Sequence, residues 1–245
     1  MLDILAIAPH PDDCEIAIGG ALARFKHEGL KVGACALTQG ERGTYGSPEL
    51  RERASVAAAE VLGLDLRETL DLPDGNVENT EENRLKLARL LRLQQPRQVF
   101  SFMPDTRHPD HGHCGQLVRE SIFLAGVARF EAGGEPFRPE GFVMFPELQL
   151  PRPPDFVVDI TDHWETKVKA IQAYGSQVHV DGIDDDNPNP ADEARKTLIK
   201  SKKFWRILEA RATLCGAMID VAYGEPFYTN APLRLNNPVG HLFQH

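Results

Sequence analysis

The stretch ILAIAPHPDDCE, residues 4–15, joins an apolar run to a dense group of ionisable side chains. Its first five residues form a short apolar segment of the kind found in buried strands. The rest carries one imidazole and three carboxylates, at the point where that strand would end. A second stretch has the same form, because VFSF at residues 99–102 is followed by DTRHPDHGH at residues 105–113. Two such clusters indicate a functional site.

Strand and helix patterns alternate along the whole chain. We expect strands at 3–8, 31–37, 68–70, 98–102, 141–145 and 156–160, and helices at 16–29, 48–62, 81–93, 112–125, 164–174 and 192–215. Residues 180–190 are rich in Asp, Asn and Pro and are expected to form a loop. The alternation predicts an α/β fold, a doubly wound and mainly parallel sheet with helices on both faces. With no clear linker in 245 residues, we predict a single domain, 1–245.

The predicted topology brings the two clusters together. Right-handed crossovers that start from the first strand give the strand order 3-2-1-4, so the first and fourth strands are neighbours. The clusters follow these two strands. We therefore expect both at the carboxyl ends of adjacent strands, in the crevice where open α/β sheets bind ligands.

The first turn lacks the glycine fingerprint of a dinucleotide site. It reads PHPDD at residues 9–13, with no glycine before Gly19, and its carboxylates would repel a pyrophosphate. This disfavours a Rossmann-like nucleotide-binding module, which is the non-enzyme alternative. A cation fits the turn better than an anion.

Two imidazoles and a carboxylate, from His10, Asp13 and His111, form a ligand set that suits Zn²⁺ and, less specifically, iron or manganese. Three protein ligands leave room for water, as in catalytic zinc sites, and Asp12 could accept a proton from that water. The alternative is that these residues cap helices and bond within turns. The second motif, HPDH at residues 108–111, favours the metal site.

The composition limits the classes of partner. A formal net charge of −9 and a pI of about 5.5 argue against a general nucleic-acid binder. No apolar run approaches the length of a membrane span, and the start of the chain has no secretory signal pattern, so we expect a cytoplasmic protein that does not bind membranes. The four scattered cysteines are expected to be free and buried.

The motifs resemble those of the PIG-L or LmbE-like family of zinc-dependent N-acetylglucosamine deacetylases. The resemblance rests on APHPDDCE after the first strand, RHPDH at 107–111, SPELRERASVAAAEVLGL at 47–64 and AYGEPFY at 222–228. Within the family, RHPDHGH and GEPF are most similar to the bacillithiol-pathway branch, which deacetylates N-acetylglucosaminyl malate.

The resemblance implies roles for the residues of both clusters. The metal ligands would be His10, Asp13 and His111. Asp12 would be the general base, and His108 would stabilise the oxyanion and help to protonate the leaving group. Asp110 would orient His108.

Two arginines are candidate substrate-binding residues. Arg51 matches a substrate-binding arginine of the family and could hold a carboxylate such as that of malate, although an exposed helix-face arginine is the alternative. Some relatives have a tyrosine where Thr106 stands, so any tyrosine role is lost, filled from elsewhere or taken by Arg107. Three other positions have two interpretations each. Glu15 could support a metal ligand or simply begin a helix, and His113 could line the site or face solvent. Glu225 could contact the sugar or form part of a turn.

The predicted function is a metal-dependent hydrolase that removes the acetyl group from an N-acetylglucosamine conjugate, with N-acetylglucosaminyl malate as the first candidate. It would use one divalent metal per chain and act on a small molecule, and the resemblance implies a homo-oligomer. The alternatives are deacetylation of another N-acetylglucosamine compound and a metal-dependent phosphoesterase. A two-metal phosphoesterase would need more ligands and a second metal about 4 Å away.

Overall fold

The computed structural model describes residues 1–180 and 197–232 of the chain. Its sheet has seven strands in the order β3-β2-β1-β4-β5-β7-β6. The first five strands in this order are parallel, and β7 runs antiparallel to both of its neighbours. The predicted order 3-2-1-4 is confirmed. The strands are β1 (Ile4–Ala8), β2 (Val32–Ala36), β3 (Leu66–Thr69), β4 (Gln98–Phe102), β5 (Gly141–Phe145), β6 (Phe156–Asp159) and β7 (Gly224–Thr229).

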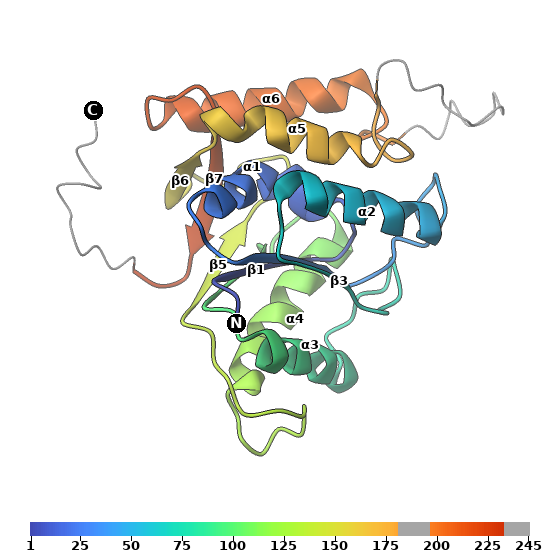
Figure 1. The fold of residues 1–245 in the computed structure, drawn as a ribbon, viewed down its shortest axis with the longest axis vertical. Coiled ribbons are helices and arrows are strands. Elements are labelled where there is room, and N and C mark those ends of the chain that lie inside the picture. The colour runs from blue at the N-terminus through green and yellow to red at the C-terminus, as the bar shows by residue number, and fades with distance from the viewer. Residues whose placement is uncertain (181–196, 233–245) are drawn as a thin grey trace.

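Helices cover both faces of the sheet, as predicted (Figure 1). The helices are α1 (Asp13–His27), α2 (Pro48–Leu62), α3 (Glu81–Gln94), α4 (Pro109–Ala125), α5 (Trp164–Gln172) and α6 (Lys202–Ala217), with a 3₁₀ turn at Thr161–His163. Helices α3 and α4 lie on one face and α1 and α2 on the other, where α5 packs over α1 and α2 and α6 packs against β7 (Figure 1). Alternate residues of β1 therefore enter two separate apolar cores, one on each face.

Helices α1 and α4 begin earlier than predicted, and this places the ionisable clusters in their first turns. Helix α1 starts at Asp13 instead of residue 16, and α4 starts at Pro109 instead of residue 112. Proline suits the first position of a helix because its missing N–H has no helical partner there. Asp13 and His111 are thus carried by helix starts next to the ends of β1 and β4, and His10 lies in the turn between β1 and α1.

The C-terminal part differs most from the prediction. The predicted helix 192–215 is wrong in its start, because residues 197–201 form turns and α6 begins after Ser201, whose hydroxyl accepts the N–H of Phe204. Residues 192–196, and the predicted loop from 181 onward, lie outside the described residues. Strand β7 was not predicted, because Pro226 lies within it and proline is rare within strands.

The four cysteines are free and buried, as predicted. In the parts of the chain that the structure describes, none of the helices is both long and apolar enough to cross a bilayer.

Candidate active site

The two ionisable clusters meet at one end of the sheet. Strands β1 and β4 are paired in parallel, so the turns that follow them lie side by side. These turns open onto a cavity of about 610 Å³. Its lining residues include the predicted ligands and base, His108 and both candidate arginines: His10, Asp12, Asp13, Arg51, Arg107, His108 and His111.

Asp13 lies between two imidazoles. Its Oδ2 atom is 3.0 Å from Nδ1 of His10, and its Oδ1 atom is 3.3 Å from Nε2 of His111. Burial would raise the pKa of Asp13, but the two histidines hold it well below its ordinary value. Asp13 in turn outweighs the effect of burial on His111 and raises its pKa to about 9. The three residues are therefore strongly coupled.

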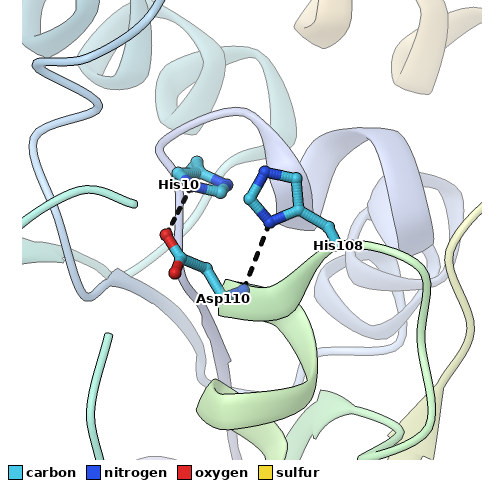
Figure 2. A group of neighbouring side chains, drawn as sticks. All are labelled: His10, His108 and Asp110. Atoms are coloured by element: carbon cyan, nitrogen blue, oxygen red, sulfur yellow. Dashed lines mark hydrogen bonds and ion pairs between the residues drawn. The ribbon is translucent and has the colours of Figure 1, made fainter. Parts of the chain in front are cut away.

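These three residues fit a divalent metal. One donor atom from each of His10, Asp13 and His111 lies within 4.8 Å of the other two. Two imidazole nitrogens and a carboxylate oxygen suit zinc and also iron or manganese. A second group with the same spacing consists of His10, His108 and Asp110, and so shares His10 with the first (Figure 2).

His108 occupies the N-cap position of α4. Its Nδ1 atom accepts the main-chain N–H of Asp110 at 3.3 Å (Figure 2). Because Nδ1 is an acceptor, a neutral His108 ring carries its proton on Nε2. Its ring centroid lies 5.0 Å from that of His10. His108 can therefore donate a hydrogen bond beside the candidate metal ligands.

The carboxylate of Asp110 lies near His108, but its hydrogen bonds and ion pair are made with other residues. It accepts the N–H groups of Gly75 at 2.8 Å and Val77 at 3.3 Å, and lies 3.4 Å from Nε2 of His10. Burial acts against these contacts, but they lower the pKa of Asp110 to about 2. Asp110 thus connects the loop after β3 to His10, and its contact with His108 is made by the main chain.

Asp12 is buried, lines the cavity and is the N-cap residue of α1, yet its carboxylate makes no capping hydrogen bond. The alternative that it merely caps a helix is therefore excluded. Burial and the charge of Asp13 raise its pKa, while Arg51 and His10 partly offset them. A carboxylate with this environment can accept a proton.

The two candidate arginines differ in exposure. Arg51 is only 7% exposed, so the exposed helix-face alternative is wrong. Its guanidinium donates to Gln177 and packs beneath the glycine turn at Gly40 and Gly43. The Arg107 side chain is 80% exposed at the cavity rim, with Nε 3.8 Å from the Glu147 carboxylate.

Two acidic residues at the site were missed from the sequence. Asp74 lies 3.1 Å from Nε2 of His10, and Glu147 lies 2.7 Å from Nδ1 of His111 in ion-pair contact. Glu147 also accepts the main-chain N–H of His108 at 2.9 Å. Both follow strand ends, β3 and β5. The rule that ligands bind at the carboxyl ends of parallel strands could have identified them.

The structure also shows the surroundings of four other positions. Glu15 is buried against Arg67 at 3.3 Å, and His113 is exposed. The hydroxyl of Thr106 donates to the His108 carbonyl, so it supports the loop. Glu225 is buried against α1 and is absent from the cavity lining, so the interpretation as a sugar contact is wrong.

Comparison with known proteins shows the family. Residues 5–122 match PIG-L, described as GlcNAc-PI de-N-acetylase. The diacetylchitobiose deacetylase of Thermococcus kodakarensis is 31% identical over 189 residues, which cover 71% of this chain and 69% of the relative. The chain belongs to the PIG-L family. Among solved structures, the conserved protein TT1542 of Thermus thermophilus superimposes with a TM-score of 0.84 and 37% identity, covering 96% of this chain and 97% of that one.

The relatives similar to this chain are named for different activities. A protein of Bacillus cereus, a probable N-acetyl-α-D-glucosaminyl L-malate deacetylase, is 23% identical, covering 82% of this chain and 96% of the relative. The 4-oxalmesaconate hydratase of Pseudomonas putida is 27% identical, covering 72% and 74%. Family membership therefore leaves the reaction to be argued from the site itself.

Proposed function

We propose that this protein is a metal-dependent deacetylase that hydrolyses the acetamide of an N-acetylglucosamine conjugate to acetate and a free amine. The observation that carries this proposal is the pair Asp12 and Asp13, one carboxylate between two imidazoles and the other facing the same cavity. Hydrolysis of an amide needs a carbonyl activator and a base at the same place. The hydratase alternative would not use an acetamide, so amine release distinguishes the two.

The metal would be held by His10, Asp13 and His111, with zinc as the first candidate. When bound, it would polarise the acetyl carbonyl and make the attacking water more acidic. The two histidine ligands have further partners: Asp74 and Asp110 at His10, and Glu147 at His111. Such contacts orient ligand side chains and increase metal affinity.

The residues of the chain would move the protons. Asp12 would accept one proton from the attacking water as the water oxygen bonds to the carbonyl carbon. The Nε2–H group of His108 hydrogen-bonds the developing oxyanion and assists protonation of the nitrogen as the C–N bond breaks. Asp110 supports this geometry through its main-chain N–H, which keeps Nδ1 of His108 as an acceptor.

The finer proposal is that the conjugate is anionic, with N-acetylglucosaminyl malate of bacillithiol biosynthesis as the first candidate. Arg42, Arg51 and Arg107 line the cavity of a protein whose formal net charge is −9. A guanidinium group can hold a substrate carboxylate through two parallel hydrogen bonds, so these arginines favour an anionic conjugate. The resemblance of RHPDHGH to the bacillithiol branch supports the same substrate.

The test is release of free amine from three substrates: N-acetylglucosaminyl malate, N,N′-diacetylchitobiose and N-acetylglucosamine. Each is assayed with zinc-loaded protein and with protein treated with a chelator. Zinc-dependent turnover that favours the malate conjugate supports both levels of the proposal. Turnover of the neutral sugars alone overturns the malate assignment, and no amine release from zinc-loaded protein overturns the deacetylase.

A metal count addresses the phosphoesterase alternative. We expect one zinc per chain by elemental analysis, because the two ligand groups at the site share His10. Two ions per chain, together with hydrolysis of a phosphate ester, would favour the phosphoesterase.

A further inference from the structure

Helix α1 is broken in its middle. At Ile18 the backbone has φ −139° and ψ 20°, which is not helical. In a continuous helix the N–H of Gly20 would bond to the carbonyl of Ile16, and the N–H of Ala21 to that of Ala17. A non-helical residue between these groups disturbs this pattern, and buried main-chain groups without partners are costly.

The two N–H groups are satisfied by Glu225 of β7. Its Oε1 atom accepts the N–H of Gly20 at 3.2 Å, and its Oε2 atom accepts the N–H of Ala21 at 2.7 Å. Glu225 is 1% exposed and also pairs with the ammonium group of Lys167 on α5.

The two carbonyl groups are satisfied by Lys167 and Arg211. Lys167 donates to the Ile16 carbonyl at 2.8 Å. Arg211 of α6 donates to the same carbonyl at 3.2 Å and to that of Ala17 at 2.8 Å. Burial lowers the pKa of Lys167 to about 8, and the adjacent Glu225 carboxylate acts in the opposite direction. We call Lys167, Arg211 and Glu225 the α1 clamp.

The α1 clamp also reaches the other side of the site. Arg211 donates to the main-chain carbonyl of Glu147. The carboxylate of Glu147 contacts His111 and accepts the N–H of His108. One guanidinium therefore connects the break in α1 to Glu147, the residue that contacts both His108 and His111.

A continuous helix would satisfy the same four groups of α1 without any side chain. The break instead requires three buried charges, which are stabilising only when every one of them is paired. The break at Ile18 changes the direction of the first part of α1. This part carries Asp13 and begins directly after Asp12. This points to a role in the geometry of the site.

We propose that the α1 clamp is a set of positioning residues that holds Asp12 and Asp13 in register with His108 and His111. The proposal rests on the proposed metal-dependent deacetylation. None of the three clamp residues lines the cavity, so they act through the main chain of α1 and of Glu147.

The test compares Arg211→Met, Glu225→Gln and Arg211→Lys with the wild-type protein. The zinc dissociation constant is measured by competition with a chromophoric chelator, and kcat and KM are measured on the best of the three acetylated substrates. We expect Arg211→Met to lower kcat by about 10²-fold, because small displacements of catalytic groups have effects of that size. Zinc affinity should fall by about 10-fold, as for other partners of metal ligands.

The KM value is the readout that separates positioning from general damage. Arg51, the buried candidate for substrate binding, lies on α2 and donates to Gln177, so KM should change by less than about 3-fold while kcat falls. Arg211→Lys keeps the charge and should recover part of kcat. Glu225→Gln is nearly isosteric, keeps one acceptor oxygen and should lower kcat by about 10-fold. If Arg211→Met fails to fold, this variant tests the positioning role in its place.

Arg92→Met is the matched control. Arg92 is also buried and donates to main-chain carbonyls, those of Ala125 and Val127, at the far end of α4. That end is about 21 Å along the helix from His111. We expect this variant to lose thermal stability while zinc affinity and kcat stay at wild-type values.

Wild-type kcat and zinc affinity in the folded clamp variants would overturn the proposal. It would also be overturned if Arg92→Met lowered kcat and zinc affinity as much as the clamp variants do. If the wild-type protein itself neither binds zinc nor releases amine, the proposed function fails. That outcome is distinct from a loss confined to the clamp variants.

Discussion

Asp12 and Asp13 are neighbours in the chain, but their carboxylates have opposite electrostatic surroundings. Burial raises the pKa of Asp12, and the charge of Asp13 adds to this effect. Burial acts on Asp13 in the same direction, but His111 and His10 outweigh it and lower its pKa. Successive residues at a helix start point about 100° apart, and Asp13 makes the direct contacts with His10 and His111, while His10 affects Asp12 through its charge. This difference is the basis for assigning one as ligand and the other as base.

Asp12→Asn should abolish most of the activity and leave the metal in place. We expect kcat to fall by about 10²- to 10⁴-fold, because the amide cannot accept a proton from water. Zinc content by elemental analysis should match the wild-type protein, since Asp13 remains. Near-normal turnover in the zinc-loaded variant would exclude Asp12 as the base.

The two histidines of HPDH should respond differently to removal. His111→Ala is expected to lose bound zinc, because its imidazole lies against Asp13 at the ligand group. His108→Ala should retain zinc and lose about 10²-fold or more in kcat, because an acid or oxyanion donor is missing. Full zinc occupancy in His111→Ala would show that the ligand set is incorrect.

At the scale of elements, the antiparallel strand β7 connects the sheet edge to the site. Its Glu225 reaches α1, and its last residue, Thr229, donates its N–H to Asp155 at 2.8 Å. Asp155 also pairs with Arg152 through two contacts of 2.7 and 2.8 Å. Arg152 and Thr229 together lower the pKa of Asp155 to about 2.

Acid should weaken this edge of the sheet. The folded-state pKa of Asp155 lies below its ordinary value of 3.8, so its contribution to stability is complete above that value and is lost as pH falls toward 2. We expect Asp155→Asn to be less stable than wild type in urea unfolding at about pH 6, with the difference shrinking toward pH 2. A constant difference across that range would contradict this assignment. In an Arg152→Gln background the pH dependence should be weaker.

At the scale of the whole molecule, the site lies where the winding of the sheet reverses. Strand β1 leads to one set of neighbours through β2 and β3, and β4 leads to the other through β5. The helices that follow β1 and β4 lie on opposite faces, so their starts diverge and leave a crevice. The candidate ligands come from both sides of that crevice.

Zinc binding should therefore stabilise the entire fold. An ion that binds the folded state at about 100 times its dissociation constant adds about 2.7 kcal/mol to the free energy of unfolding. We expect the thermal midpoint to rise with zinc and to fall with chelator. His111→Ala is the control, because its midpoint should not respond to zinc. An equal response in that variant would place the zinc elsewhere.

The part of the site that was predicted consists of residues directly after recognisable strands. His10 and His111 come together because the strand order 3-2-1-4 was correct. Asp74 and Glu147 were missed because single acidic residues in loops are common and carry no motif. Glu225 was assigned two alternatives, and neither was its actual place in a helix break.

The sequence by itself determined the α/β class, the adjacency of the two clusters and the chemical nature of the candidate ligands, because apolar periodicity and strand order are local and topological properties. The tertiary structure decided what depends on packing between distant segments. It turned Asp110 toward the loop after β3, paired the buried Arg51 with Gln177 and gave the main-chain groups at the break in α1 partners from α5, α6 and β7. A local pattern cannot specify such contacts, since each partner is separated from the other by tens to hundreds of residues and only the packed fold brings them together.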